Sequence, residues 1–294
     1  MNPAPQTITL RAETLPSPLA GLTGADARGI VLAAFDRSLY LDLDGQVVAL
    51  ASSDLSRGPI VITLRHPGAL PGVNTGEPVR LHAGRLQVGP VEVDLRNATV
   101  WDPTLPPAGA TARSAARSVV IDELLAAAPD ESIAGLLGTR RDDRAPHSLL
   151  LASLSKGLGA IDAWLSGRLD AESASAIVGR EVAGRGPGLT PSGDDLLVGI
   201  MLGARVLSDA GGVCSVQDVR DVLASAAMPH TTRISGAYLD AARHGWASEP
   251  WHALVRALAG QPEHVRGAAR RLLGIGETSG ADTLTGFCWV WRDR

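Results

Sequence analysis

The sequence predicts an α+β protein, in which an N-terminal antiparallel β barrel or sandwich-like domain precedes a mostly α-helical C-terminal domain. From Thr7 to about Leu105, short runs rich in Val, Ile, Leu and Thr alternate with turn residues, which is typical of antiparallel strands. After the Pro-, Gly- and Ala-rich stretch from Asp102 to Gly109, the period of the apolar pattern changes from about two residues, as in a strand, to nearer 3.6 residues, as in a helix. We therefore predict a β-rich domain over residues 1–109 and a helical domain over 110–294.

The first domain contains candidate strands separated by recognisable turns. The dipeptide Asp44-Gly45 predicts a tight hairpin, and His82-Ala83-Gly84 and Gly89-Pro90 predict two further turns. The expected strands are Thr7–Arg11, Ile30–Phe35, Leu39–Leu43, Gln46–Ala51, Ile60–Leu64, Val79–Leu81, Arg85–Val88, Val91–Leu95 and Ala98–Trp101.

The second domain has the apolar spacing and the Ala and Leu content of helices. Thr111 is a candidate cap for the first helix and Pro129 ends it. The expected helices are Ala112–Ala128, Ser148–Ser166, Glu172–Val182, Asp194–Leu207, Val216–Ala227, Thr232–His244, Pro250–Ala259, Glu263–Leu273 and Ala281–Trp291.

Composition excludes several classes of partner. The formal net charge of -4 gives no electrostatic footprint for nucleic acid, and no basic run suggests a membrane surface. Two cysteines, no signal-peptide pattern and no apolar stretch long enough to span a bilayer indicate a soluble cytoplasmic protein. The seven histidines show no common metal-ligand spacing, so no metal site of that kind is predicted.

One stretch, Gly184 to Asp195, combines glycines, two prolines, two hydroxyls and two carboxylates directly before an apolar helix. We call it the first turn. Its hydroxyls and helix-start N–H groups suit an anion, whereas Asp194 and Asp195 would hold a cation, orient an arginine or act as a base. The alternative is that Ser192 or Asp194 simply caps the helix.

Two further polar turns precede predicted helices. The second turn, His230 to Ser235, contains Arg233, whose guanidinium could bind a carboxylate or phosphoryl group, although a capping Thr with a surface Arg is the alternative. The third turn, Gly276 to Thr283, repeats the first: glycine, paired hydroxyls, glycine, then the carboxylate of Asp282. Three such turns in one domain favour a common site, although capping explains each of them separately.

From these turns we predict two sets of site residues, and no cofactor is required. The candidate catalytic residues are Asp194, Asp195, Arg233 and Asp282. The candidate substrate-binding residues are Gly188, Thr190, Ser192, Gly193, Thr231, Thr232, Ser235, Thr278, Ser279, Gly280 and Thr283.

The turns resemble a known family in order and spacing. Gly186-Pro187-Gly188-Leu189-Thr190-Pro191-Ser192-Gly193-Asp194-Asp195, Thr232-Arg233-Ile234-Ser235 and Ser279-Gly280-Ala281-Asp282-Thr283 resemble the signature turns of the AllH family. This resemblance covers roughly Gly184 to Leu284. It implies a subunit of oxamate carbamoyltransferase in anaerobic allantoin breakdown, working with partner subunits of the AllF and AllG type. The implied reaction transfers a carbamoyl group between carbamoyl phosphate and oxamate, with oxalurate as the carbamoylated partner.

Three functional hypotheses remain open. The first is a carbamoyltransferase subunit acting on a small carboxylated amide. The second is a non-catalytic scaffold or binding subunit that positions partner enzymes, suggested by apolar tryptophans near both ends of the helical domain. The third is a metal-dependent hydrolase that uses Asp194, Asp195 and Asp282 around a hard cation such as Mg²⁺. A homo-oligomer is compatible with each.

Overall fold

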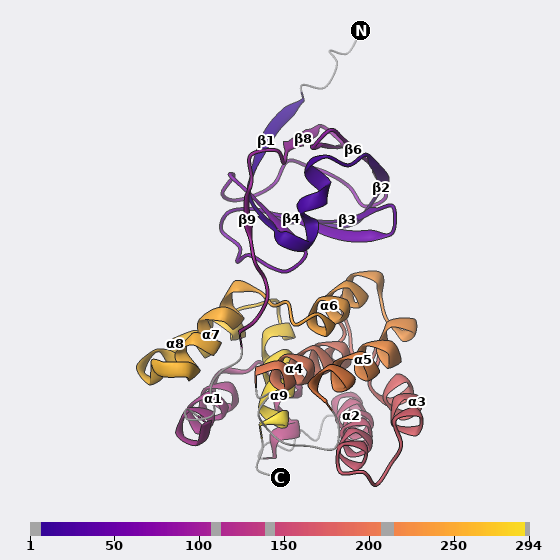
Figure 1. Ribbon diagram of the computed structural model, residues 1–294, viewed down its shortest axis with the longest axis vertical. Coiled ribbons are helices and arrows are strands. Elements are labelled where there is room, and N and C mark those ends of the chain that lie inside the picture. Colours follow the sequence, from indigo (N-terminus) through magenta and orange to yellow (C-terminus); the bar gives the residue numbers. More distant parts are fainter. Residues whose placement is uncertain (1–6, 107–112, 139–144, 207–214, 292–294) are drawn as a thin grey trace. The chain divides into compact units, whose positions relative to one another are not determined.

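The chain divides into two compact units, Met1–Pro103 and Thr104–Arg294. The computed structural model describes residues 7–106, 113–138, 145–206 and 215–291 (Figure 1). The first unit is a β barrel and the second is mostly helical, so the predicted α+β class is confirmed and the barrel is the form that the β-rich part takes. The predicted boundary at residue 109 and the candidate cap at Thr111 lie outside the described residues.

Every strand predicted in the first unit is present. The strands are β1 (Ile8–Pro16), β2 (Ala27–Phe35), β3 (Ser38–Leu43), β4 (Gln46–Ala51), β5 (Val61–Leu64), β6 (Pro78–His82), β7 (Arg85–Val88), β8 (Val91–Asp94) and β9 (Thr99–Trp101). β1 is longer than predicted, and a 3-10 helix, Ser17–Thr23, follows it.

The barrel closes because β1 pairs on both of its edges. Along the order β5-β4-β3-β2-β6-β7-β8-β1, neighbouring strands are hydrogen-bonded, and β1 also pairs with β5, which completes an eight-stranded ring. β9 pairs with the second half of β1. Most pairs are antiparallel, as predicted, whereas β4–β5, β1–β8 and β1–β9 are parallel.

Tight turns fix the register of the hairpins. Asp44 and Gly45 both have positive φ, 47° and 93°, and they join β3 to β4 as the sequence predicts. Ala83 and Gly84 make a second such turn between β6 and β7, with φ of 48° and 73°. Inside the ring, alternate strand residues such as Val48, Leu50 and Leu86 are fully buried and form the core of this unit.

Every helix predicted in the second unit is also present. The α-helices are α1 (Arg113–Ala127), α2 (Ala145–Leu165), α3 (Ala171–Glu181), α4 (Ser192–Val206), α5 (Val216–Ala227), α6 (Arg233–Arg243), α7 (Glu249–Gly260), α8 (Val265–Leu273) and α9 (Ser279–Val290). Short 3-10 helices lie at η3 (Ile133–Leu137), η4 (Met228–His230) and η5 (Pro262–His264).

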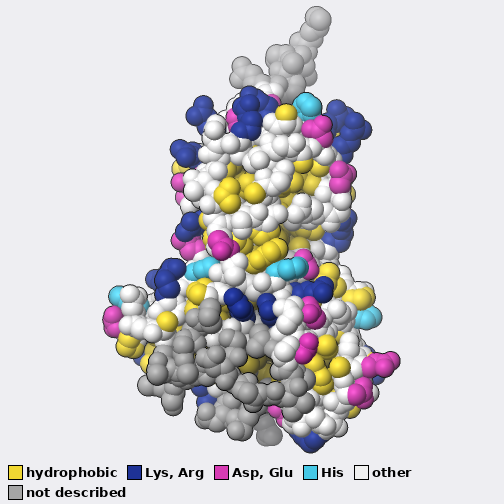
Figure 2. Space-filling view, viewed as in Figure 1, with side chains coloured by type: hydrophobic (Ala, Val, Ile, Leu, Met, Phe, Trp, Pro, Cys, Tyr) yellow, Lys and Arg dark blue, Asp and Glu magenta, His cyan; other side chains and the backbone are white. Residues whose placement is uncertain are grey.

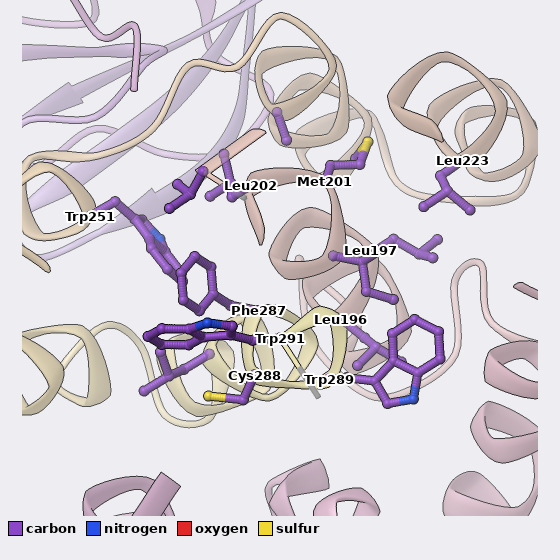
Figure 3. Close-up of a cluster of buried hydrophobic side chains, with 14 of the residues drawn as sticks. Leu196, Leu197, Met201, Leu202, Leu223, Trp251, Phe287, Cys288, Trp289 and Trp291 are labelled. Carbon is purple, nitrogen blue, oxygen red and sulfur yellow. The ribbon is translucent and has the colours of Figure 1, made fainter. Parts of the chain in front are cut away.

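Helices α4 and α9 form the centre of the helical unit. They lie side by side, with α5 and α6 packed against α4 and with α1 and α8 packed against α9 (Figure 1). Their apolar side chains build the main core, where Phe287 lies between Trp251 and Trp291 (Figure 3). The ring centroid of Phe287 is 5.1 Å from that of Trp251 and 5.7 Å from that of Trp291. Both helices are therefore buried and hold the turns at their ends in place.

Acidic and basic side chains are interspersed on the face shown in Figure 2. No helix within the described ranges has the length and apolar character needed to cross a bilayer.

Candidate functional site

The three turns lie at the N-termini of three helices that pack together. The first turn leads into α4, the second into α6 and the third into α9. In α4 and α9 the chains run in the same direction, since Gly199 lies against Thr283 and Gly203 lies against Phe287. Their N-termini are therefore adjacent, and the positive ends of their dipoles point to one region.

Glycines allow α4 and α9 to approach this closely. A methyl group added at Gly199 would lie 1.9 Å from the Thr283 carbonyl oxygen, and one added at Gly286 would lie 2.0 Å from the Leu196 carbonyl oxygen. Both distances are far below van der Waals contact, so only glycine fits at either position. The close packing fixes the third turn beside the first.

Direct hydrogen bonds join the turns. The Thr190 and Ser279 hydroxyl oxygens are 2.9 Å apart and link the first turn to the third. The Thr232 hydroxyl donates to the Leu189 carbonyl oxygen at 2.6 Å and links the second turn to the first. Sequence segments about 40 and 90 residues apart thus form a single cluster, which we call the three-turn cluster: residues 184–195, 230–235 and 276–283.

Asp194 is the main connection within the three-turn cluster. One carboxylate oxygen accepts the Gly184 N–H at 2.9 Å, and the other accepts the hydroxyls of Thr231 and Ser235, the latter at 2.8 Å. The residue is fully buried. Burial raises its pKa, while the three hydrogen bonds act in the opposite direction. Asp194 therefore holds the first turn to the start of α6.

Asp195 has different surroundings, although it follows directly in the chain. It is 6% exposed, and its Oδ2 atom is buried without a hydrogen-bond partner. Burial raises its pKa well above the usual range; the Asp282 and Asp194 carboxylates raise it further, against the opposing effect of the Ser279 and Thr190 hydroxyls. A carboxyl of this kind holds its proton more tightly, and as a carboxylate is a stronger base, than an ordinary aspartate.

Asp282 brings a fourth segment to the cluster. It is fully buried in the first turn of α9, and its Oδ1 atom accepts the backbone N–H of Ile133, at the start of η3, at 2.8 Å. This bond joins residues 149 positions apart. Asp282 therefore faces Asp195 on one side and anchors η3 on the other.

The glycine-rich part of the first turn is exposed and bends sharply. Gly184, Gly186 and Gly188 all have positive φ, 66°, 114° and 92°, a conformation that favours glycine. A methyl group added at Gly186 would lie 2.7 Å from the Ser192 nitrogen, so the turn folds back onto the N-terminus of α4. The cluster thus combines exposed backbone in the glycine-rich part of the first turn with buried carboxyl groups.

The other predicted residues have more varied positions. Thr232 caps α6, since its side chain accepts the Ser235 N–H at 3.0 Å, and Arg233 is exposed beside it, as the capping alternative predicts. Gly193 and Gly280 are buried against the carbonyl oxygens of Val182 and Leu272. Ser192 and Thr283 are buried within their helices, Thr278 precedes α9 without a side-chain capping bond, and Gly188 is exposed.

The cluster also contains residues that the sequence did not single out. Ile133 contributes a backbone N–H and Gly184 another, and neither residue type carries a chemical signal. A methyl group at Gly184 would lie 2.3 Å from the His230 carbonyl oxygen, so this glycine also sets the spacing between the first and second turns. Only the positive φ expected of a loop glycine pointed to Gly184 in advance.

The carboxylates do not form an evident cation site. Within the described ranges, no group of three or more His, Cys, Asp or Glu side chains is arranged to hold a metal ion. The metal-dependent hydrolase therefore lacks such a ligand set in this part of the chain. What the cluster offers is three helix N-termini, hydroxyls and two buried carboxyls with raised pKa, Asp194 and Asp195.

Two family models match the chain. The family model described as "Oxamate carbamoyltransferase subunit AllH" matches residues 182–291, which include all three turns. The model described as "AllH family N-terminal domain" matches residues 5–100, the barrel. A search of solved structures found no match. Because the two models together cover most of the chain, the protein belongs to the AllH family.

Proposed function

We propose that this chain is a carbamoyltransferase subunit that moves a carbamoyl group between carbamoyl phosphate and oxamate, with the three-turn cluster as its site. The family supports a carbamoyltransferase subunit. The observation that carries the finer proposal is the buried carboxyl group of Asp195, beside which the N-termini of α4 and α9 bring the Thr190 and Ser279 hydroxyls together.

The proposed substrates fit a site of this chemistry. Oxamate is a small anion with a carboxylate beside an amide, and carbamoyl phosphate carries a phosphoryl group. Helix N-termini and hydroxyls favour such oxyanions. Thr190, Ser279 and Thr278 are the hydroxyls that we assign to binding, and Arg233, at the start of α6, is the cation that we assign to the substrate carboxylate.

The reaction requires a proton to move. The amide nitrogen of oxamate attacks the carbamoyl carbon, a C–N bond forms, the C–O bond to phosphate breaks, and the nitrogen loses a proton. We assign the acceptance of that proton to the Asp195 carboxylate, since its raised pKa makes it a stronger base than an ordinary aspartate. In the reverse direction, phosphate attacks oxalurate and the same group returns the proton to the departing oxamate.

Asp194 and Asp282 have positioning roles in this proposal. Asp194 holds the first turn against α6, and Asp282 raises the pKa of Asp195 by its charge. The proposal includes no resident cofactor. It includes partner subunits of the AllF and AllG type, a role in allantoin breakdown in the cytoplasm, and Mg²⁺ only as a companion of the phosphoryl group.

The direct test is phosphorolysis of oxalurate. The isolated chain and the chain mixed with its partner subunits are supplied with oxalurate and phosphate, and carbamoyl phosphate is measured with and without Mg²⁺. We expect formation at least with the partners present, and a loss of at least about 100-fold in Asp195→Asn. Folded protein that is inactive in both preparations would rule out this substrate.

A second candidate is a scaffold subunit without chemistry of its own. The observation that favours it is that both carboxylate oxygens of Asp194 bond only to this chain's own groups, as in a structural connection. In that case Asp195→Asn and Arg233→Ala would leave the activity of the assembled complex at the wild-type level. The same two variants separate the two candidate functions, because the carbamoyltransferase proposal requires a large loss of activity in at least Asp195→Asn.

A further inference from the structure

Arg220, in α5, is a buried cation far from the three-turn cluster. Its side chain is only 7% exposed. Its Nη2 atom donates to the Gln217 side-chain oxygen, whereas its Nε atom is buried without a hydrogen-bond partner. An arginine keeps its charge at any pH a protein experiences, so this group cannot avoid the cost of burial by losing its proton.

A second arginine lies beside it. A methyl group added at Gly245 would lie 3.0 Å from Arg220 Nη1 and 3.4 Å from both Nε and Cδ of Arg205. The two guanidinium groups therefore approach the same point, at the C-terminal end of α4. Burial lowers the pKa of Arg220, and repulsion from Arg205 lowers it further.

The carboxylate of Asp221, which acts on Arg220, is already engaged. Asp221 accepts Arg243 Nε at 2.6 Å through one oxygen and Gln217 Nε2 at 2.9 Å through the other. Among the described residues, Asp221 is the only carboxylate whose charge favours the charged form of Arg220. Arg205 donates Nε to the neutral carbonyl oxygen of Leu105, at 3.2 Å. Among the described residues, Arg220 and Arg243 thus share this one carboxylate.

We propose that Arg205 and Arg220 form a binding site for a small oxyanion of the phosphate type. Two guanidinium groups that approach one point match a tetrahedral oxyanion, because each can donate a pair of N–H bonds to its oxygens. The excess positive charge favours a doubly charged anion over chloride or a monocarboxylate. This site does not depend on the proposed carbamoyl transfer.

The site is separate from the three-turn cluster. Asp194 and Arg205 lie eleven residues apart on α4, which corresponds to about 16 Å along the helix axis. Gly245, with φ of 77°, has no side chain, and both arginines pack closely against it. A side chain there would be strained by the positive φ and would crowd the two arginines.

Thermal unfolding of the full chain tests this proposal. Midpoints are measured in sodium phosphate and in sodium chloride at equal ionic strength and pH. The wild-type midpoint should rise by a few degrees with phosphate and then saturate. Arg220→Met should lose that rise. Without phosphate this variant should be at least as stable as the wild type, because it removes a buried charge that Arg205 repels.

Two controls isolate the effect. Arg270→Met removes an arginine that is paired with the buried Glu123, so it should lower the midpoint equally in both salts. The Thr190→Ala, Ser279→Ala double variant changes the three-turn cluster and leaves both arginines in place. Its unfolding midpoint should therefore still rise with phosphate by the amount that Arg220→Met removes. The proposal is overturned if Arg220→Met keeps the full rise, or if it is destabilised equally in both salts, since Arg220 would then serve only the structure.

Discussion

Asp194 and Asp195 are neighbours in the chain whose roles are separated by their hydrogen bonds. Asp194 accepts three donors from the first turn, the second turn and α6, whereas Asp195 keeps one buried oxygen without a partner. The sequence could predict that this pair lies in a polar turn at a helix start. It could not distinguish the two, because the donors to Asp194 come from residues 10, 37 and 41 positions away.

The first prediction concerns the stability of the cluster. Asp194→Ala leaves three donors without their acceptor, and we expect a loss of about 3 kcal/mol or more in the free energy of unfolding. Urea unfolding followed by circular dichroism measures it. The matched control is Asp170→Ala, which removes an exposed helix cap that accepts Ser173 N–H and should cost only about 1 kcal/mol. Equal losses in the two variants would contradict the role of Asp194.

The second prediction concerns the pH dependence of Asp195. Its pKa in the folded chain lies above the ordinary value of 3.8, so the folded state binds this proton more tightly than the unfolded state. The resulting stability is full below about pH 3.8 and is lost as the pH rises through the folded-state pKa. Asp195→Asn does not titrate. Its stability relative to the wild type should therefore increase as the pH rises above 3.8 and should level off once the pH exceeds the folded-state pKa.

Asp170→Asn supplies a control of opposite sign. The hydrogen bonds from Ser173 lower the pKa of Asp170, so its contribution is present at neutral pH and is lost as the pH falls through the lowered value. The cost of Asp170→Asn should therefore shrink in acid. A stability difference for Asp195→Asn that does not change with pH would contradict the account of Asp195.

At the scale of elements, the hydrophobic pattern and the turn residues predict each strand and helix in the described ranges, but not all of their ends. β1 continues to Pro16 because its second half pairs with β5 and β9, which are distant in sequence. Helix α4 starts at Ser192, two residues before the predicted start, because Ser192 and Gly193 resemble turn residues in the sequence alone. Parallel pairing also depends on contacts between distant segments.

The third prediction concerns the close packing of α4 and α9. Gly199→Ala places a methyl group 1.9 Å from the Thr283 carbonyl oxygen, so the helices must separate. We expect a loss of about 3 kcal/mol or more, and weaker binding of any ligand at the first and third turns. Gly159→Ala in α2 is the control, since nothing lies within 4 Å of the added methyl group, and it should stabilise the chain by about 0.5–1 kcal/mol.

The outcome of this pair decides whether the helix contact matters. If Gly199→Ala is as stable as Gly159→Ala, then α4 and α9 adapt without cost. The glycines would then not be what holds the first turn beside the third.

At the scale of the whole molecule, the change in periodicity after the stretch from Asp102 to Gly109 predicts a β-rich unit followed by a helical one. Each unit has its own core, one inside the barrel and one around α4 and α9. All residues of the three-turn cluster belong to the second unit. The meeting of the turns was a hypothesis in the sequence; the part that could not be predicted is the link from Asp282 to Ile133, which spans 149 positions.

The fourth prediction follows from the separate cores. A chain of residues 104–294 should fold alone, with a cooperative unfolding transition, since its core and its cluster need no residue of the barrel. Circular dichroism and thermal unfolding check this. An unfolded or aggregated product, while the full chain is folded, would show that the helical unit depends on the barrel.

The most direct test of the central claim is a crystal structure of the chain grown with oxamate and phosphate, together with its partner subunits if these are needed for binding. We predict density for a small anion in contact with the Thr190 and Ser279 hydroxyls, near the carboxyl group of Asp195. An ordered oxamate bound elsewhere, with the three-turn cluster empty at saturating concentration, would contradict the assignment of the site.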